Sequence, residues 1–284
     1  MPIDPTAVGA SVGPVASSWD TRDCMLYALS VGACMDDATG RELQFVTENT
    51  RHLELVALPT MCTVLGGVLS APSPLAQIGD YDRRKSVHGS VELELHRPLP
   101  TAGTVESTIT VEGIHDKRSG ALVMLRIDAI DASGPLFTIR NGIFVRGEGG
   151  FGGAPGPRWA GGDHPEGAPG VTVSMTTRFE QPLLYRLNGD RNPLHSDPAV
   201  AVAAGFERPI MHGLCTLGFV GRALIGYACD GEADRVAKLG VRFSNPVMPG
   251  DTIETRIWPG ADDLRFAAFV DDRPVLAEGY LTLR

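Results

Sequence analysis

The chain has 284 residues, of which 43% are hydrophobic and 21% charged, and its formal net charge is −9. This composition is typical of a soluble globular protein with one or two domains. The acidic balance argues against a nucleic-acid-binding protein, whose phosphate contacts need a basic face. It leaves room for a small anion held by a few local Lys or Arg side chains.

Five cysteines are spread along the chain without a C-x-x-C pair: Cys24, Cys34, Cys62, Cys215 and Cys229. Four of them have apolar neighbours, where cysteine behaves as a small buried hydrophobe, so a reducing compartment is expected. The first residues lack the basic and apolar regions of a secretory signal. The most apolar stretch, 214–229, is interrupted by Arg222 and is too short to span a bilayer. We therefore expect a cytoplasmic protein without a membrane span.

The first half of the chain is predicted to be mainly β-structure. Between residues 91 and 145, four runs alternate apolar and polar residues, which is the pattern of half-buried strands. The preceding segment, 64–79, is apolar but contains Pro72 and Pro74, which exclude an uninterrupted helix. We interpret it as a central helix that is mostly lost, leaving space inside the fold, or alternatively as a surface loop.

A stretch rich in glycine and proline, 147–170, shows no apolar periodicity and is predicted to be a linker. It divides the chain almost evenly. We predict an N-terminal half over residues 1–150, a linker over 151–170 and a C-terminal half over 171–284.

After the linker the sequence predicts a strand, a loop, a short helix and a long helix, followed by strands to the C-terminus, at 172–179, 187–195, 198–204 and 214–229 respectively. The long helix is apolar on nearly every side, so it should be buried. Gly218, Gly221 and Gly226 would let it lie close against a sheet. A sheet wrapped around one buried helix is the hot-dog arrangement.

The two halves share a faint internal repeat. Residues 98–109 align without gaps on residues 246–257, and in each case a turn precedes an alternating run with Thr and Glu at the same offsets. Although any two strands look somewhat alike, a duplication explains the shared turn better. The predicted fold class is α+β, a double hot-dog of two antiparallel sheets that each wrap a helix, with a degenerate central helix in the N-terminal half.

The densest group of polar residues lies on the loop after the linker. Gly189 and the Asn192-Pro193 pair favour turns, so Asp190 and His195 are held on irregular backbone between apolar residues. A carboxylate and an imidazole on one tight loop can share a water molecule. One group can take a proton from the water while the other protonates a carbon atom, which is the acid/base chemistry that hydrates an activated alkene.

The loop and the residues after it form a long motif: Gly189-Asp190-x-Asn192-Pro193-Leu194-His195, then Asp197-Pro198, Ala204-Gly205-Phe206 and Pro209-Ile210-x-His212-Gly213. This motif resembles the signature of the MaoC-like, (3R)-specific 2-enoyl-CoA hydratases. The resemblance covers nearly the whole chain and is strongest to the members with two hot-dog units, such as the hydratase module of peroxisomal multifunctional enzymes. In the first half it rests on Leu26-Tyr27-Ala28-Leu29, Val31-Gly32-Ala33, His88-Gly89, Arg97-Pro98-Leu99-Pro100 and Gly149-Gly150-Phe151-Gly152.

The resemblance implies that Asp190 and His195 activate water and that the product is a (3R)-3-hydroxyacyl-CoA. It also implies that the Gly213 amide donates to the thioester carbonyl. Gly213 opens the long helix, where unpaired N–H groups and the helix dipole favour a developing oxyanion. Asn192 is expected to fix the loop or to touch the water. No cofactor is expected apart from the CoA of the substrate, and no metal, because the spacing of the acidic and histidine residues matches no standard zinc pattern.

The same resemblance places ligand contacts on His88, Gly89, Lys117 and Phe243, and we expect further substrate contacts from Arg191, Pro193 and Leu194 of the loop. Lys117 suits a CoA phosphate, but its turn-like surroundings fit a solvated hairpin equally well. Phe243 could flank the pantetheine or the adenine. For His212, packing at the start of the long helix is as good an interpretation as ligand contact.

Other functions fit parts of this pattern. A dehydratase acting on carrier-protein substrates would run the same chemistry backwards, and a hot-dog thioesterase would attack the thioester carbonyl without needing both Asp190 and His195. A non-catalytic acyl-CoA-binding subunit would not need the complete set with Asn192. The expected partners are an acyl-CoA and, because hot-dog units commonly bury a sheet edge by association, a second copy of the chain. Fatty-acid and sterol side-chain metabolism both stay open.

Overall fold

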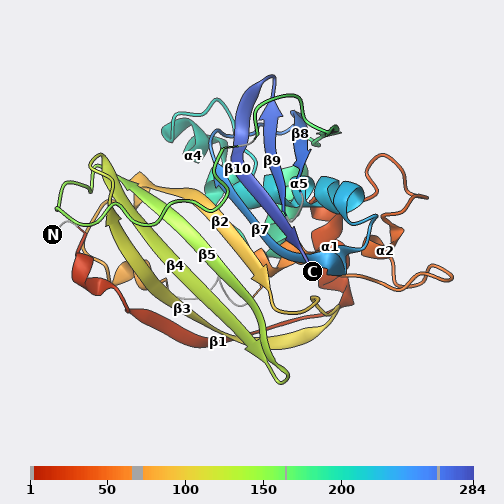
Figure 1. Ribbon diagram of the computed structural model, residues 1–284, viewed down its shortest axis with the longest axis horizontal. Helices are drawn as coiled ribbons and strands as arrows, with labels where there is room; N and C mark the ends of the chain where they lie inside the picture. Colours follow the sequence, from red (N-terminus) through yellow and green to blue (C-terminus); the bar gives the residue numbers. More distant parts are fainter. Residues whose placement is uncertain (1–2, 66–72, 164, 261–262) are drawn as a thin grey trace.

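The computed structural model describes residues 3–65, 73–163, 165–260 and 263–284, and its strands form one sheet (Figure 1). The first half contributes β1 (Ser11–Trp19), β2 (Ser86–Leu95), β3 (Gly103–Asp116), β4 (Gly120–Asp131) and β5 (Gly134–Arg146). The second half contributes β6 (Val171–Thr176), β7 (Val236–Phe243), β8 (Thr252–Pro259), β9 (Leu264–Val270) and β10 (Arg273–Leu283).

The strand order is symmetric about the middle of the sheet. It reads β1-β3-β4-β5-β2-β7-β10-β9-β8-β6, so each half repeats the same arrangement, and all the pairings are antiparallel. The halves join edge to edge where β2 pairs with β7, from Ser90 opposite Arg242 to Glu94 opposite Lys238. The predicted double hot-dog is confirmed, with its two sheets joined into one of ten strands.

The internal repeat occupies equivalent places in the two halves. Its two copies form the starts of β3 and β8, each of which lies second from an outer edge of the sheet. In both strands every other side chain is buried, and the buried sets match: Val105, Ser107 and Ile109 in β3, and Ile253, Thr255 and Ile257 in β8. The alternation that predicted strands also selects the face that packs on the core.

The helices are α1 (Thr21–Ser30), α2 (Leu43–Val46), α3 (Gln181–Tyr185), α4 (Pro198–Ala203) and α5 (Gly213–Ala228). Helix α5 is the central helix of the second half and is buried from Cys215 to Ile225. Its glycines were expected to let the helix lie close against the sheet, but they face other neighbours. A Cβ on Gly218 would lie 2.3 Å from Val31, and one on Gly221 would lie 2.8 Å from Thr60, so these glycines admit segments of the first half.

The buried stretch of α5 contains one charged side chain, Arg222. Its guanidinium donates to both oxygens of Glu42 at 2.7 and 2.6 Å and to the carbonyl of Val31 at 2.9 Å. Glu42 directly precedes α2, so this ion pair ties the central helix of the second half to a segment of the first half.

The first half has no comparable central helix among the described residues of 64–79. The 3₁₀ helices η2 (Pro59–Val64) and η3 (Pro74–Ala76) flank this place, and residues 66–72, with Pro72, lie outside the described part. The other 3₁₀ helices are η1 (Pro5–Ala7), η4 (Arg83–Lys85), η5 (Arg186–Asn188), η6 (Pro193–His195) and η7 (Ala233–Arg235).

Several boundaries differ from the prediction. Strand β6 runs from Val171 to Thr176 and not from residue 172 to 179, although the Thr177 amide still donates to the Asp251 carbonyl at 2.9 Å, next to the last β6–β8 pair. Between β5 and β6 the described residues form no helix or strand, and the division of the chain into two halves and a linker stays a prediction. Strand β1 and helix α1 were not predicted; a capping box of Asp20 and Asp23 starts α1.

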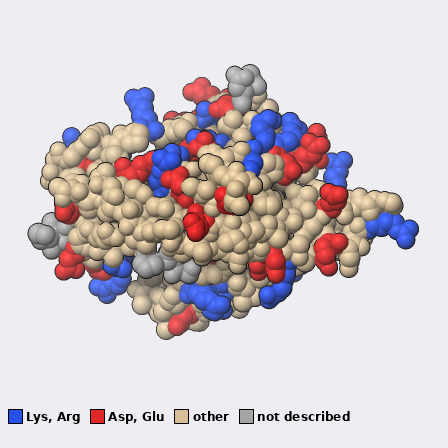
Figure 2. All heavy atoms as spheres, turned by 90° about the horizontal axis from the view of Figure 1, so that it is seen from below, with Lys and Arg blue, Asp and Glu red and all other residues tan. Residues whose placement is uncertain are grey.

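On the face shown in Figure 2, basic and acidic side chains are interspersed, without a broad basic area of the kind that a phosphate backbone requires. None of the helices in the described ranges is long and apolar enough to cross a membrane. The five cysteines are free thiols; four of them are buried and Cys34 is partly exposed, as their apolar neighbours suggested.

Candidate active site

The acid/base loop runs from Gly189 to His195 and is shaped by its own sequence. Gly189 ends η5 with φ +116°, a left-handed conformation that favours glycine. Asn192 caps η6, since its Oδ1 accepts from the Leu194 amide at 3.1 Å, and Pro193 occupies the first position of that turn. The backbone N–H of Asn192 donates to Asp190 Oδ1 at 3.3 Å. Of the two roles expected for Asn192, this geometry favours fixing the loop.

His195 is buried, with 9% of its surface exposed, and one ring nitrogen is committed. Its Nδ1 lies 2.9 Å from the carbonyl oxygen of Ile210. Because a carbonyl can only accept, Nδ1 carries the proton and Nε2 keeps a lone pair. Burial lowers the pKa of His195 below its usual value, although the Ile210 hydrogen bond and the charge of Asp190 act in the opposite direction. A neutral imidazole of this kind can accept a proton near neutral pH.

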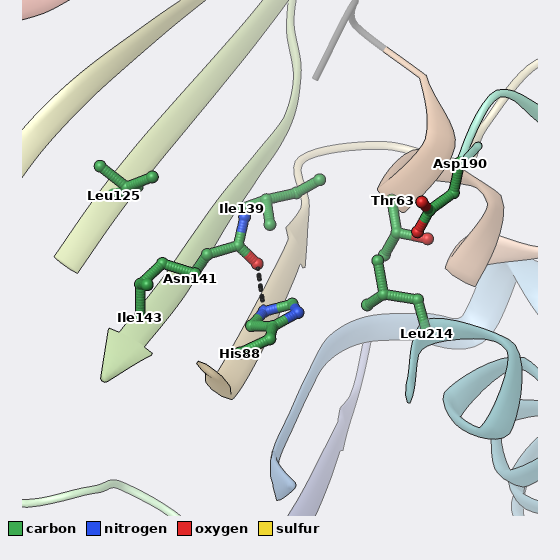
Figure 3. Close-up of a pocket in the computed structure, with 8 residues that line it drawn as sticks. All are labelled: Thr63, His88, Leu125, Ile139, Asn141, Ile143, Asp190 and Leu214. Carbon is green, nitrogen blue, oxygen red and sulfur yellow. Dashed lines mark hydrogen bonds between the residues drawn. The ribbon is translucent and has the colours of Figure 1, made fainter. Parts of the chain in front are cut away.

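Asp190 faces a cavity of about 210 Å³ that lies between the two halves (Figure 3). Thr63 of η2 and Leu214 of α5 lie beside the carboxylate. The opposite wall belongs to the sheet of the first half and consists of Leu125, Ile139, Ile143, Asn141 and His88. The three β5 residues of this wall alternate along the strand and therefore share one face. The cavity is thus mostly apolar, with the acid/base loop at one end.

Two predicted contact residues, His88 and Phe243, meet beside this cavity. The rings of His88 and Phe243 lie 4.8 Å apart, and His88 Nε2 is 3.0 Å from Asn141 Oδ1. The Phe243 ring also covers the start of α5, where a Cβ on Gly213 would approach it to 3.0 Å. Only glycine fits there without displacing the ring. Gly89 follows His88 at an irregularity of the β2–β5 ladder.

The Gly213 amide lies at the N-terminal end of α5, and its role as an oxyanion donor stays a prediction. Gly213 is the first residue of α5, and the first four N–H groups of a helix have no partner within it. His212 before it makes no side-chain hydrogen bond to the helix, so the side chain at the N-cap leaves these donors available. Donors at this end of the long helix also benefit from the positive end of its dipole.

The remaining predicted substrate contacts lie away from the described cavity wall. Lys117 lies in the β3–β4 hairpin, where its amide donates to the Gly120 carbonyl at 2.9 Å and its side chain is half-buried. Arg191 and Pro193 are exposed on the loop, and Leu194 is half-buried. Contact between these four residues and the CoA portion of a substrate stays a prediction.

Sequence reasoning did not find most of the cavity wall. Leu125, Ile139 and Ile143 look like any inward-facing residues of a strand, so nothing local distinguishes them. Asn141 gave a usable signal, since it is a polar residue on the apolar face of a strand. For His212 the sequence left packing and ligand contact open. In the structure its ring stacks on that of His195, with 3.8 Å between the centroids.

Among the described residues, no group of three or more His, Cys, Asp or Glu side chains is arranged to hold a metal ion.

Fold and site together define a double hot-dog protein with a carboxylate at a mostly apolar cavity and a buried imidazole on the same loop as that carboxylate. Residues 17–147 match the model of the MFE-2 hydratase 2 N-terminal domain, and residues 162–274 match that of the MaoC-like domain. The chain belongs to the MaoC-like hydratase family, in its form with two hot-dog units. The resemblance stated from the sequence is confirmed.

Relatives and solved structures agree over nearly the full length. The 3-hydroxyacyl-thioester dehydratase Y of Mycobacterium tuberculosis is 42% identical over 91% of this chain and 88% of its own. Enoyl-CoA hydratase ChsH3 of the same organism is 40% identical over 91% of this chain and 90% of its own. The crystal structure of a MaoC-like dehydratase from Phytophthora capsici has a TM-score of 0.89 at 28% identity, and the match covers 100% of this chain and 98% of that one.

Proposed function

We propose that this protein is a hydro-lyase of lipid metabolism that reversibly adds water to trans-2-enoyl-CoA to give (3R)-3-hydroxyacyl-CoA. Relatives at 40% identity or more bear the names enoyl-CoA hydratase and 3-hydroxyacyl-thioester dehydratase, which describe two directions of one reaction. The observation that carries the proposal is the hydrogen bond of the His195 ring, which fixes the ring nitrogen that bears the proton. Its Nδ1 is fixed on Ile210, which leaves a basic Nε2 on the same loop as a carboxylate that faces the cavity.

In the proposed mechanism, Asp190 and His195 Nε2 hold one water molecule between them. As the water oxygen bonds to C3 of the enoyl group, His195 takes one of its protons, and the Asp190 carboxylate orients the water and stabilises the imidazolium. The electrons of the double bond move toward the thioester, and His195 returns its proton to C2. Water is thereby added in full and both side chains recover their starting states. Such acid/base groups contribute roughly 10²–10⁴-fold each.

The charge that develops on the thioester oxygen would be stabilised by the Gly213 amide. One preorganised donor of this kind is worth about 10²–10³-fold in rate. The Phe243 ring against Gly213 closes this position on one side and would keep the thioester from sliding along α5. The space left in the first half, where a central helix is missing among the described residues, would receive the acyl chain.

A dehydratase that acts on a carrier-protein thioester is the second candidate, because the name 3-hydroxyacyl-thioester dehydratase leaves the carrier open. The site chemistry would be identical, and only the contacts outside the cavity would differ. A thioesterase is a weaker candidate, since it has no use for an acid/base pair near C3. The proposed reaction needs no cofactor apart from the CoA of the substrate. We further propose a homodimer in the cytoplasm, where five free thiols would stay reduced.

The proposal predicts a specific pH dependence. The imidazolium form of His195 cannot accept a proton from water, so kcat/KM should fall as the pH drops through the pKa of this residue. Burial lowers that pKa below 6.5. The acid limb is therefore expected below pH 6.5, measured as kcat/KM from about pH 5 to about pH 8 with circular dichroism to confirm folding. An acid limb centred at or above pH 6.5 in a folded enzyme would contradict the neutral-base assignment.

The direct test is a steady-state assay of enoyl absorbance over straight-chain, branched and steroid-side-chain CoA esters, with chiral analysis of the product. Loss of absorbance with a (3R) product is expected. Assays with the same acyl groups on a carrier protein distinguish CoA from a carrier protein as the natural substrate. A higher kcat/KM on the carrier-protein esters would favour the second candidate. Release of free thiol without addition of water would point to a thioesterase and overturn the proposal.

A further inference from the structure

We propose that His212 is a positioning residue that locks the acid/base loop onto the start of α5, so that Asp190 and His195 keep a fixed distance from the Gly213 amide. The inference rests on the proposed function, because it concerns how the parts of that site are held together. His212 touches neither substrate nor water in this assignment; it acts through the two residues that do.

The loop and the segment before α5 are joined by two hydrogen bonds that run in opposite directions. His195 on the loop donates from Nδ1 to the carbonyl of Ile210, at 2.9 Å. His212, two residues further along, donates from Nε2 to the carbonyl of Asp190, at 3.2 Å. Each of the two catalytic residues is therefore bonded to the segment that ends at Gly213. A movement of the loop along α5 would have to break both bonds.

Ring packing holds His212 in the orientation that this bond needs. The His212 ring stacks on His195 with 3.8 Å between centroids and 29° between planes, and it packs on Tyr185 at 4.8 Å. Only 1% of its surface is exposed. The side chain is thus enclosed between the catalytic imidazole and the last residue of α3, which leaves it no room to turn.

Packing alone does not account for a histidine at this position. Among the described residues, the Nδ1 atom of His212 is buried without a hydrogen-bond partner, which is a cost that a phenylalanine of similar shape would avoid. What the histidine adds over phenylalanine is the bond from Nε2 to Asp190. The hydrogen bond from Nε2 to Asp190 therefore explains why a histidine stands here even though its Nδ1 has no partner.

Burial, together with the neighbouring basic groups, keeps His212 from competing with His195 for the proton of water. The groups that face it are His195, Asp190, Tyr185 and Arg186. Burial, followed by the nearby His195 and by Arg186, lowers the pKa of His212 to about 4, against an opposing effect of Asp190. His212 is therefore neutral at neutral pH, and its protonated nitrogen is already used on the Asp190 carbonyl. It stays a donor, and the base function belongs to His195.

Two substitutions separate the hydrogen bond from the ring. His212→Phe keeps the stacked ring and removes the donor, so the Asp190 backbone is released; a small misplacement of this kind can lower kcat by about 10–100-fold. KM should change by less than about threefold. The acid limb of kcat/KM should stay in place, because the phenylalanine ring keeps His195 buried. His212→Gln keeps a donor at similar reach and removes the ring, so kcat should stay within about threefold. The acid limb should then move to higher pH, because His195 loses part of the burial that lowers its pKa.

The wild-type enzyme and His115→Gln serve as references, with melting temperatures and circular dichroism for every variant. Wild-type hydration of crotonyl-CoA decides the proposed function, and only the ratios of variant to wild type decide the role of His212. His115 is half-buried and lines a second cavity that shares no lining residue with the candidate site, so its variant should match the wild type in kcat and acid limb. A folded Phe variant with wild-type kcat would overturn the inference. If the Phe variant does not fold, a folded Gln variant that loses more than about tenfold in kcat, or whose acid limb does not move, overturns it instead.

Discussion

Asp190→Asn and His195→Gln are each expected to lower the rate of crotonyl-CoA hydration by at least about two orders of magnitude. Glutamine cannot accept a proton from water, and asparagine cannot stabilise the imidazolium that forms when His195 does. Because the two groups act on one water molecule, the double variant should lose little more than the worse single variant. Steady-state kcat and kcat/KM at a pH above the acid limb give the measurement.

A matched control lies close by on the same segment. Asp197 caps α4 by accepting from the Ala199 amide at 2.8 Å, and asparagine caps a helix about as well as aspartate. Asp197→Asn should therefore hydrate crotonyl-CoA at nearly the wild-type rate. Near-normal turnover by either Asp190→Asn or His195→Gln, in protein with a wild-type melting temperature, would rule out the proposed acid/base pair.

The acid/base loop and the long helix could be predicted because their signals are local. Gly189 and Pro193 each constrain the backbone at their own positions, and both lie where the loop turns. The apolar run after His212 predicted α5 to within one residue at each end. The repeat at 98–109 and 246–257 predicted a strand in each half, and together with the buried helix it indicated a duplicated hot-dog fold.

The rest depends on contacts that only the folded chain creates. The junction of the halves at β2 and β7 brings together residues 144 to 152 positions apart in the sequence, and no property of Glu92 or Gly240 alone marks them as partners. The cavity wall joins alternate positions of β5 to the loop of the other half. Its polar member, Asn141, is the part of that wall that a sequence could have suggested. The glycines of α5 were noticed, but which neighbour they admit could not be deduced from the helix alone.

Arg222 was recognised in the sequence only as an interruption of an apolar stretch, yet its ion pair predicts the largest effect on stability. The side chain of Arg222 is 6% exposed and that of Glu42 is 29% exposed. Glu42→Ala would leave the Arg222 charge buried with two uncharged acceptors, the Val31 carbonyl and the Met175 sulfur, as its hydrogen-bond partners among the described residues. We expect the free energy of unfolding to fall by about 3 kcal/mol, the lower end for a broken buried pair because Glu42 reaches solvent. The loss is measured by urea unfolding. The control Glu106→Ala, at an exposed position of β3, should change the free energy of unfolding by less than about 0.5 kcal/mol.

The double variant Glu42→Met with Arg222→Met shows whether the charge or the lost packing is responsible. Replacing a buried ion pair by apolar side chains of similar volume is often neutral, since both desolvation costs disappear together. The double variant should therefore be more stable than Glu42→Ala, even though it lacks every hydrogen bond of the pair. Equal losses in Glu42→Ala and Glu106→Ala would show that the pair does not hold α5 to the first half. Because Gly213 begins this helix, a confirmed loss would also mean that the helix carrying the proposed oxyanion donor is held in place by a contact with the first half.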